Sequence, residues 1–242
     1  MKRRKRELRF GLNVDERPGE GLRRIALGQI DVAVRALRGD CDGSPAERVH
    51  EARKALKRLR ALLRLLEDEL GERVYERESA VVRETGKRLA QARDAEVLLA
   101  TLDGLIERHP KELAGRRGVQ RLRARLQRER DGAARAALAD NGRQDGALAE
   151  LLALRMCVAA WQLTDAGGLE AVEPALARIY GKGRKRMRRA ARANGGRTRG
   201  RRLHEWRKRV KDLRYVAEML ERERAGDGSS RGGGKRGARK RA

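Results

Sequence analysis

Residues 44–70 read SPAERVHEARKALKRLRALLRLLEDEL, and this stretch predicts one long amphipathic helix. Ser44 can act as the N-cap, Pro45 takes the first helical position and Glu47 completes a capping box, while Gly71 ends the segment. Leucines recur along one face, and a histidine, arginines and lysines recur along the opposite face. The sequence therefore predicts a helix with one face in a core and a cationic face turned outward.

Part of this helix is repeated near the C-terminus. The eleven residues from His50 to Arg60 align with the eleven from His204 to Arg214, and seven positions are identical. Two of the three histidines in the chain occupy the first position of a copy. The copies start 154 residues apart, which is too long for a solenoid repeat and favours two duplicated half-domains, 21–140 and 141–225.

Each copy gathers its cations on one side of the helix. At about 100° per residue, the first copy holds a histidine and six cations within an arc of about 160°. The two stripes consist of His50, Arg53, Lys54, Lys57, Arg58, Arg60 and Arg64 in the first copy, and His204, Arg207, Lys208, Lys211, Arg214 and Tyr215 in the second.

The single sign of charge distinguishes these stripes from an ordinary solvated face. Exposed helix faces usually mix glutamate with lysine, because like charges at i,i+4 destabilise a helix by a few tenths of a kcal/mol per pair. An unrelieved row of cations therefore predicts a bound anion. The first stripe is about 21 Å long at 1.5 Å per residue, which favours a chain of phosphates over a single phosphate ester.

A third basic helix precedes the second copy. Its cations share one face, and a solvated basic helix is the alternative interpretation; they are Arg178, Arg184, Lys185, Arg188 and Arg192.

Composition supports an all-α protein that binds a polyanion. Aromatic residues make up 2% of the chain, and the hydrophobic residues are mostly alanine, leucine and valine, which is typical of helical bundles. The net charge is +26. The first ten residues and residues 226–242 each carry a net +5, so the part between them is itself strongly basic at +16.

The ends of the chain and the cysteines add further expectations. Residues 1–20 are expected to form a basic arm, and the Gly, Ser, Arg and Lys residues of 226–242 a disordered tail. Cys41 and Cys157 lie far apart, which argues against a disulfide framework or a zinc site. With no apolar run of membrane-spanning length, we expect a cytoplasmic protein that can associate with polyanion granules or with the nucleoid.

Helix-stop residues predict further helical segments along the rest of the chain. Asp94 is expected to cap one of them, and Gly167-Gly168 is expected to precede the third basic helix. The expected segments are 21–37, 72–92, 94–109, 119–139, 144–163, a basic helix ending at Arg192, and 201–224.

Both stripe motifs resemble the signature of the CHAD family, the conserved histidine α-helical domain. The first reads Val49-His50-x-x-Arg53-Lys54-x-x-Lys57-Arg58-x-Arg60, and the second reads Leu203-His204-x-x-Arg207-Lys208-x-x-Lys211-x-x-Arg214-Tyr215. Arg93-Asp94 is similar to an Arg-Asp element of the family. The resemblance covers roughly residues 21–221.

This resemblance implies two helical bundles related by a pseudo-two-fold axis, with a basic central channel that binds inorganic polyphosphate. It adds Arg93 to the two stripes as a candidate polyphosphate ligand, and the basic face of the third helix contributes Arg184, Lys185 and Arg188 as further candidates. One departure is Asp212, an acid where the first copy has Arg58, which implies weaker binding by the second stripe.

Catalysis is not expected. A phosphoanhydride-cleaving enzyme needs carboxylates that hold Mg²⁺, or a nucleophile paired with a base, and the stripes supply neither, so we expect no catalytic residue, metal site or cofactor. Nucleic-acid binding is the alternative function, because phosphate contacts also dominate affinity for DNA and RNA. The chain has six aromatic residues in all, too few for base-stacking platforms, so nucleic acid would be bound mainly through the basic tails.

Overall fold

The computed structural model describes residues 10–13, 16–138, 143–164, 170 and 172–221. Within these ranges the protein is helical and contains no β-strand, which confirms the all-α prediction. The helices are α2 (Pro18–Arg38), α3 (Pro45–Leu65), α4 (Glu67–Leu70), α5 (Glu72–Arg88), α6 (Ala90–Arg108), α7 (Pro110–Leu113), α8 (Arg117–Ala137), α9 (Arg143–Ala159), α10 (Glu173–Ala191) and α11 (Gly196–Leu220).

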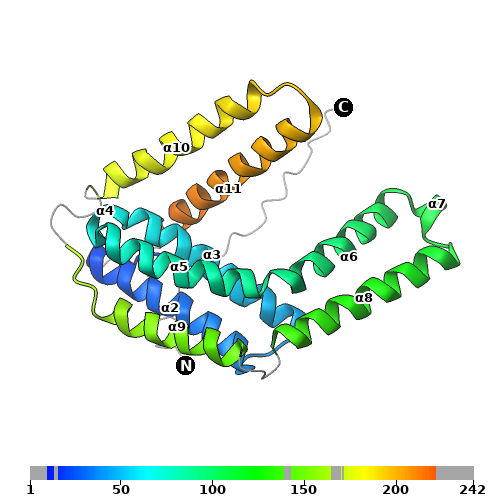
Figure 1. Cartoon of the computed structure of the whole chain (residues 1–242), viewed down its shortest axis with the longest axis horizontal. Helices are drawn as coiled ribbons and strands as arrows, with labels where there is room; N and C mark the ends of the chain where they lie inside the picture. Colours follow the sequence, from blue (N-terminus) through cyan, green and yellow to red (C-terminus); the bar gives the residue numbers. More distant parts are fainter. Residues whose placement is uncertain (1–9, 14–15, 139–142, 165–169, 171, 222–242) are drawn as a thin grey trace, which may run out of the picture.

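The helices form a bundle from which two hairpins diverge (Figure 1). Helices α2, α3, α5 and α9 make the bundle, and the α6/α8 hairpin and the α10/α11 hairpin extend from it in different directions. Helix α3 is central, because it packs against α2, α5, α8, α10 and α11. The first copy of the repeated motif therefore lies at the junction of the bundle with both hairpins.

Leucines on one face of α3 fix it in the core. Leu59, Leu62 and Leu63 are at most 1% exposed, and they lie with Ile25 and Ile30 of α2 in one apolar cluster. The predicted capping box at the start of α3 is present: the Glu47 amide donates to Ser44 Oγ at 3.4 Å, and the Ser44 amide donates to Glu47 Oε2 at 2.7 Å. Burial of the leucine face leaves the cationic face of α3 directed away from this core.

Several predicted boundaries are wrong by a few residues. The long helix stops at Leu65 and a short α4 follows, instead of one helix that runs to residue 70. Helix α9 ends at Ala159 rather than 163, and α11 begins at Gly196, five residues before the predicted start. The glycines around 195–200 are weak helix formers, and they hid the first turn of α11.

Asp94 does not cap a helix. Helix α6 begins at Ala90, directly after Leu89, so Asp94 lies in its second turn. The break between α5 and α6 is fixed by a distant side chain instead: Arg53 Nη1 donates to the Leu89 carbonyl at 2.6 Å and to the Gly86 carbonyl at 3.3 Å. These bonds satisfy carbonyl groups at the end of α5, and a local sequence pattern could not reveal them.

The core crosses the predicted boundary between halves. Helix α9 belongs to the second half by sequence, yet it packs against α2 and α5, with Arg155 Nε donating to Asp31 Oδ1 at 2.7 Å. The pseudo-two-fold relationship stays a prediction. Helix α11 ends at Leu220 and Glu221 is extended, so the predicted helix end at residue 224 is wrong. The predicted tail 226–242 lies outside the described residues.

Among the helices that the structure describes, none combines the length and the apolar character that crossing a bilayer requires.

Candidate polyanion-binding groove

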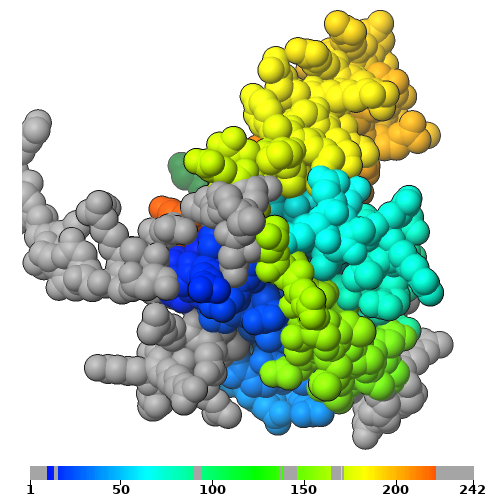
Figure 2. Space-filling view, turned by 90° about the vertical axis from the view of Figure 1, so that its left-hand side faces the viewer, coloured from blue at the N-terminus to red at the C-terminus, as the bar shows by residue number. Residues whose placement is uncertain are grey.

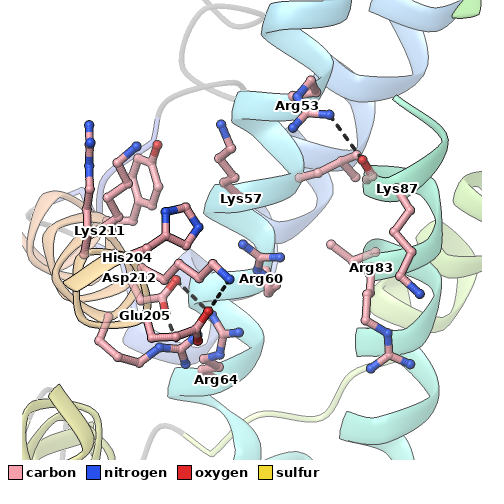
Figure 3. Close-up of a pocket in the computed structure, with 17 residues that line it drawn as sticks. Arg53, Lys57, Arg60, Arg64, Arg83, Lys87, His204, Glu205, Lys211 and Asp212 are labelled. Atoms are coloured by element: carbon pink, nitrogen blue, oxygen red, sulfur yellow. Dashed lines mark hydrogen bonds and ion pairs between the residues drawn. The ribbon is translucent and has the colours of Figure 1, made fainter. Parts of the chain in front are cut away.

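A groove with a volume of about 470 Å³ lies between α3, α5 and α11 (Figure 3). Ten of its lining side chains are lysine or arginine and two are carboxylates, so its formal charge is +8 with histidine neutral. The lining residues are Arg53, Leu56, Lys57, Arg60, Arg64, Val82, Arg83, Gly86, Lys87, His204, Glu205, Arg207, Lys208, Arg209, Lys211, Asp212 and Tyr215.

Both copies of the repeated motif contribute to this one groove. Helix α3 supplies cations at i, i+4, i+7 and i+11, which is the spacing of one face of a helix, and α11 supplies the facing wall. Figure 3 shows the α3 side chains and the α11 side chains on opposite sides of the same space. The predicted residues brought together here are Arg53, Lys57, Arg60 and Arg64 from α3, and His204, Arg207, Lys208, Lys211 and Tyr215 from α11.

The most buried part of the groove holds a carboxylate between guanidinium groups. Asp212 is 4% exposed, and its carboxylate lies 2.8 Å from Arg64 Nη1 and 3.3 Å from Arg209 Nη1. The pKa values of Arg60 and Arg209 are lowered, first by burial and then by the positive charge of Arg64. Among the described residues, the buried Nε atoms of Arg60 and Arg209 have no hydrogen-bond partner, so this region retains unsatisfied donors.

A search against family models matches residues 24–229 to the CHAD domain. The chain belongs to the CHAD family. No curated protein matches the chain. The family is known generally for polyphosphate binding, and CHAD domains are generally non-catalytic binding domains. The match covers both helices that carry the repeated motif, and thus both facing walls of the groove.

Helix α5 adds a third wall to the groove of this CHAD domain, which the sequence did not reveal. Arg83 and Lys87 line the groove, and Glu84 lies between them in the sequence. Glu84 Oε1 is 2.9 Å from Lys87 Nζ and 3.3 Å from Arg83 Nε. Hydrogen bonds from Lys87 and then Arg83 lower the pKa of Glu84. The mixture of signs resembles an ordinary solvated helix, and only the i,i+4 spacing of the two cations hinted at a shared face.

Glu205 lies at the rim of the groove and connects the two helices of the α10/α11 hairpin. Its carboxylate is 2.6 Å from Lys208 Nζ and 3.2 Å from Arg186 Nη1 of α10. The hydrogen bond from Lys208 is the main cause of a lowered pKa at Glu205. Glu205 thus offsets part of the charge at the rim.

Four residues of the predicted stripes lie outside the groove in this CHAD domain. His50 Nδ1 is 3.2 Å from Glu96 Oε1, and Lys54 Nζ is 3.7 Å from Glu51. Arg58 lies 4.1 Å from the centre of the Phe10 ring, with Nη2 3.4 Å from Glu218 Oε2. Arg214 packs over the ring of Tyr215 and lies 3.5 Å from Glu218. A face 160° wide is thus divided between the groove and neighbouring helices.

The remaining predicted ligands lie elsewhere. The side chain of Arg93 is outside the described residues. Arg184, Lys185 and Arg188 line a separate hollow on α10 and do not line the groove. Arg178, which belongs to the predicted basic face of the same helix, anchors the base of α10. Its guanidinium contacts Glu67 and Asp68 of α4 and donates to the Arg64 carbonyl at 3.2 Å.

Proposed function

We propose that this CHAD domain binds inorganic polyphosphate in the groove between α3, α5 and α11, without catalysing its reaction. The observation that carries the proposal is the convergence of both motif copies on one groove that has ten cations and two carboxylates. Helices 154 residues apart in sequence have no local reason to face each other with charges of the same sign. A bound polyanion offsets the repulsion that this arrangement creates.

The groove suits a chain of phosphates. From Arg53 to Arg64 the α3 wall extends about 16 Å at 1.5 Å per residue, which is longer than one phosphate group needs. Arginines can hold phosphate oxygens through two parallel N–H donors, lysines act as mobile point charges, and His204 and the Tyr215 hydroxyl can donate further hydrogen bonds. The unsatisfied donors of Arg60 and Arg209 would gain acceptors.

A non-catalytic role is supported by the state of the two carboxylates. Asp212 is held between Arg64 and Arg209, and Glu205 is held between Lys208 and Arg186. Two carboxylates that each serve as counter-ions to cations are poorly suited to grip a metal ion between them. Binding without cleavage therefore accounts for the groove with the fewest assumptions.

A cytoplasmic location is part of the proposal. Cys41 and Cys157 are free thiols in the structure, as expected of a protein in a reducing compartment. In the cytoplasm, the protein would bind polyphosphate in granules or at the nucleoid.

The test removes one lysine from each facing wall. Lys57→Gln with Lys211→Gln takes two charges from the groove and keeps both leucine-bearing helix faces. We expect polyphosphate affinity, measured by calorimetry, to fall roughly tenfold or more, which corresponds to about 1.4 kcal/mol. The matched control is Lys111→Gln with Lys182→Gln, which removes the same charge from exposed lysines outside the groove and should bind like the unaltered protein.

A graded series of chain lengths completes the test. Affinity should rise from triphosphate to longer chains, because each added phosphate reaches another cation of the groove. The proposal is wrong if triphosphate binds as tightly as long chains, or if the groove variant and its control lose affinity equally. Duplex DNA as a competitor distinguishes the alternative function: nucleic acid that displaces long polyphosphate at equal phosphate concentration would favour nucleic-acid binding.

A further inference from the structure

A second basic surface covers the side of α10 that faces away from α11. Its hollow has a volume of about 550 Å³ and is lined by Gly181, Arg184, Lys185, Arg188, Arg189 and Arg192, which we call the α10 ridge. The opposite side of α10, with Ala175, Ile179 and Ala190, is buried. Figure 2 shows α10 along the outer surface of its hairpin, with α11 behind it. The ridge therefore lies on a different face from the groove.

The cations of the ridge differ from their neighbours on the same helix. Arg178 and Lys182 of α10 contact Glu67, and Arg186 contacts Glu205. Among the residues that the structure describes, none of the five ridge cations forms an ion pair with a carboxylate. The α10 dipole favours cations in the last turn, but Arg184 and Lys185 precede that turn. Within the described part of the chain, the ridge is thus an accumulation of positive charge that no carboxylate offsets.

Cations on α11 connect the groove to the ridge. His204, Lys208 and Lys211 line the groove, and Arg197 and Arg201 continue the same helix face at spacings of three and four residues toward the far end of the hairpin. Both arginines are exposed and neither lines the groove. At that end, Arg202 Nη1 donates to the Arg189 carbonyl of α10 at 3.1 Å, so the two helices are in contact where the path crosses.

We infer that a long polyphosphate chain leaves the groove along α11, crosses the end of the hairpin and continues on the α10 ridge, an inference that rests on the function proposed for the groove. The path from Lys211 to Arg197 is about 21 Å long, and the ridge from Arg192 to Arg184 adds about 12 Å. Chains that fill only the groove do not reach the ridge. The ridge therefore makes the protein selective for long chains, because a chain already held in the groove meets the ridge at high effective concentration.

The experiment compares short and long chains on a ridge variant. Arg184→Gln, Lys185→Gln and Arg188→Gln together remove three charges from an exposed helix face, and glutamine preserves helix propensity. We expect unchanged affinity for chains short enough to fit in the groove, and a loss of tenfold or more for long chains. The control is Arg117→Gln, Arg121→Gln and Arg128→Gln on α8, which removes the same charge from the other hairpin. It should leave the affinities for short and for long chains unchanged.

The other outcomes decide against the inference. It is overturned if the ridge variant binds long chains as the unaltered protein does, or if it loses short and long chains equally. A ridge variant that loses only duplex DNA would assign the ridge to nucleic acid, and this also overturns it. Failure of the proposed function is separate, because it appears as unchanged short-chain binding when Lys57 and Lys211 are replaced in the groove.

Discussion

Asp212 and Arg58 occupy equivalent positions in the two motif copies but have different surroundings in the folded chain. Arg58 contacts Phe10 and Glu218 outside the groove, whereas Asp212 is buried between Arg64 and Arg209. The acid therefore supplies a counter-ion to guanidinium groups that water cannot fully solvate. Weaker anion binding by the second stripe, which the acid implied at the sequence level, stays a prediction.

Replacing Asp212 by Asn should destabilise the free protein and increase its stabilisation by polyphosphate. Removing one partner of a buried ion pair costs up to about 3–5 kcal/mol, and less here because Arg64 and Arg209 keep some exposure. A bound anion would replace the lost charge, so the melting temperature should rise more on adding polyphosphate than it does for the unaltered protein. An equal rise in both proteins would contradict a role for Asp212 as counter-ion.

Glu78 is a buried acid of α5 that does not line the groove. It is 1% exposed, and Trp161 Nε1 donates to its Oε1 at 3.3 Å. Burial raises its pKa, and the hydrogen bonds from Trp161 and Arg77 only partly oppose the increase. The folded state holds the Glu78 proton more tightly than the unfolded state does, so the protonated carboxyl group contributes to the stability of the fold. This contribution is complete below the ordinary pKa of 4.5 and is lost as pH rises through the raised pKa.

The variant Glu78→Gln should therefore be more stable than the unaltered protein at neutral pH. Glutamine has the same shape, can accept the Trp161 hydrogen bond and does not ionise. Thermal unfolding at about pH 4 and about pH 7.5 should show an advantage that is larger at the higher pH. An advantage independent of pH would mean that Glu78 does not titrate differently on folding.

The start of α3 and the end of α5 are fixed in two different ways. The start of α3 is encoded locally, since Ser44 and Glu47 satisfy each other's amides within four residues of sequence. The end of α5 depends on Arg53, which is 33 residues from the Gly86 carbonyl that it reaches. Since Arg53 also lines the groove, the same contact orients α5 against α3 and so sets the position of the third wall.

Loss of the α3 cap should be measurable as a loss of stability. Ser44→Ala removes the acceptor for the Glu47 amide and should reduce the free energy of unfolding by about 1 kcal/mol, measured by urea denaturation. Ser79→Ala is a matched control, because no described residue forms a hydrogen bond with the buried Ser79 hydroxyl. That control should cost nothing or slightly stabilise the protein. Equal losses in the two variants would argue against the cap.

Positive charge is unevenly distributed over the molecule. Residues 173–220, which form α10 and α11, hold 17 lysines and arginines against four acids, a net of +13 out of +26 for the whole chain. Residues of this hairpin line both the groove and the α10 ridge. Polyanion binding should therefore depend on the folded hairpin more than on the basic ends of the chain.

Deleting residues 226–242 tests this distribution. The deletion removes a net +5 and should leave polyphosphate affinity and its salt dependence nearly unchanged, while DNA binding weakens. The Lys57→Gln and Lys211→Gln variant should instead make the salt dependence of polyphosphate binding shallower by about 0.7 log units per lost contact. Polyphosphate binding that disappears with the tail would assign the activity to the ends of the chain.

The capped, amphipathic pattern of residues 44–70 and its repetition at residues 204–214 were sufficient to predict an all-α fold, the family and both cationic helices. These features depend on local propensity and on the periodicity of one helix, both of which are written in consecutive residues.

Which cations share a groove depends on the packing of helices distant in sequence. The position of α6 places His50 beside Glu96, α11 places Glu218 beside Arg58, and α5 brings Arg83 into the groove. A periodic pattern gives the direction of a side chain around its own helix, but the neighbour that it meets is fixed by how the apolar faces pack together. The folded core therefore determined where the two predicted stripes meet, and it placed the cationic face of the third basic helix away from them.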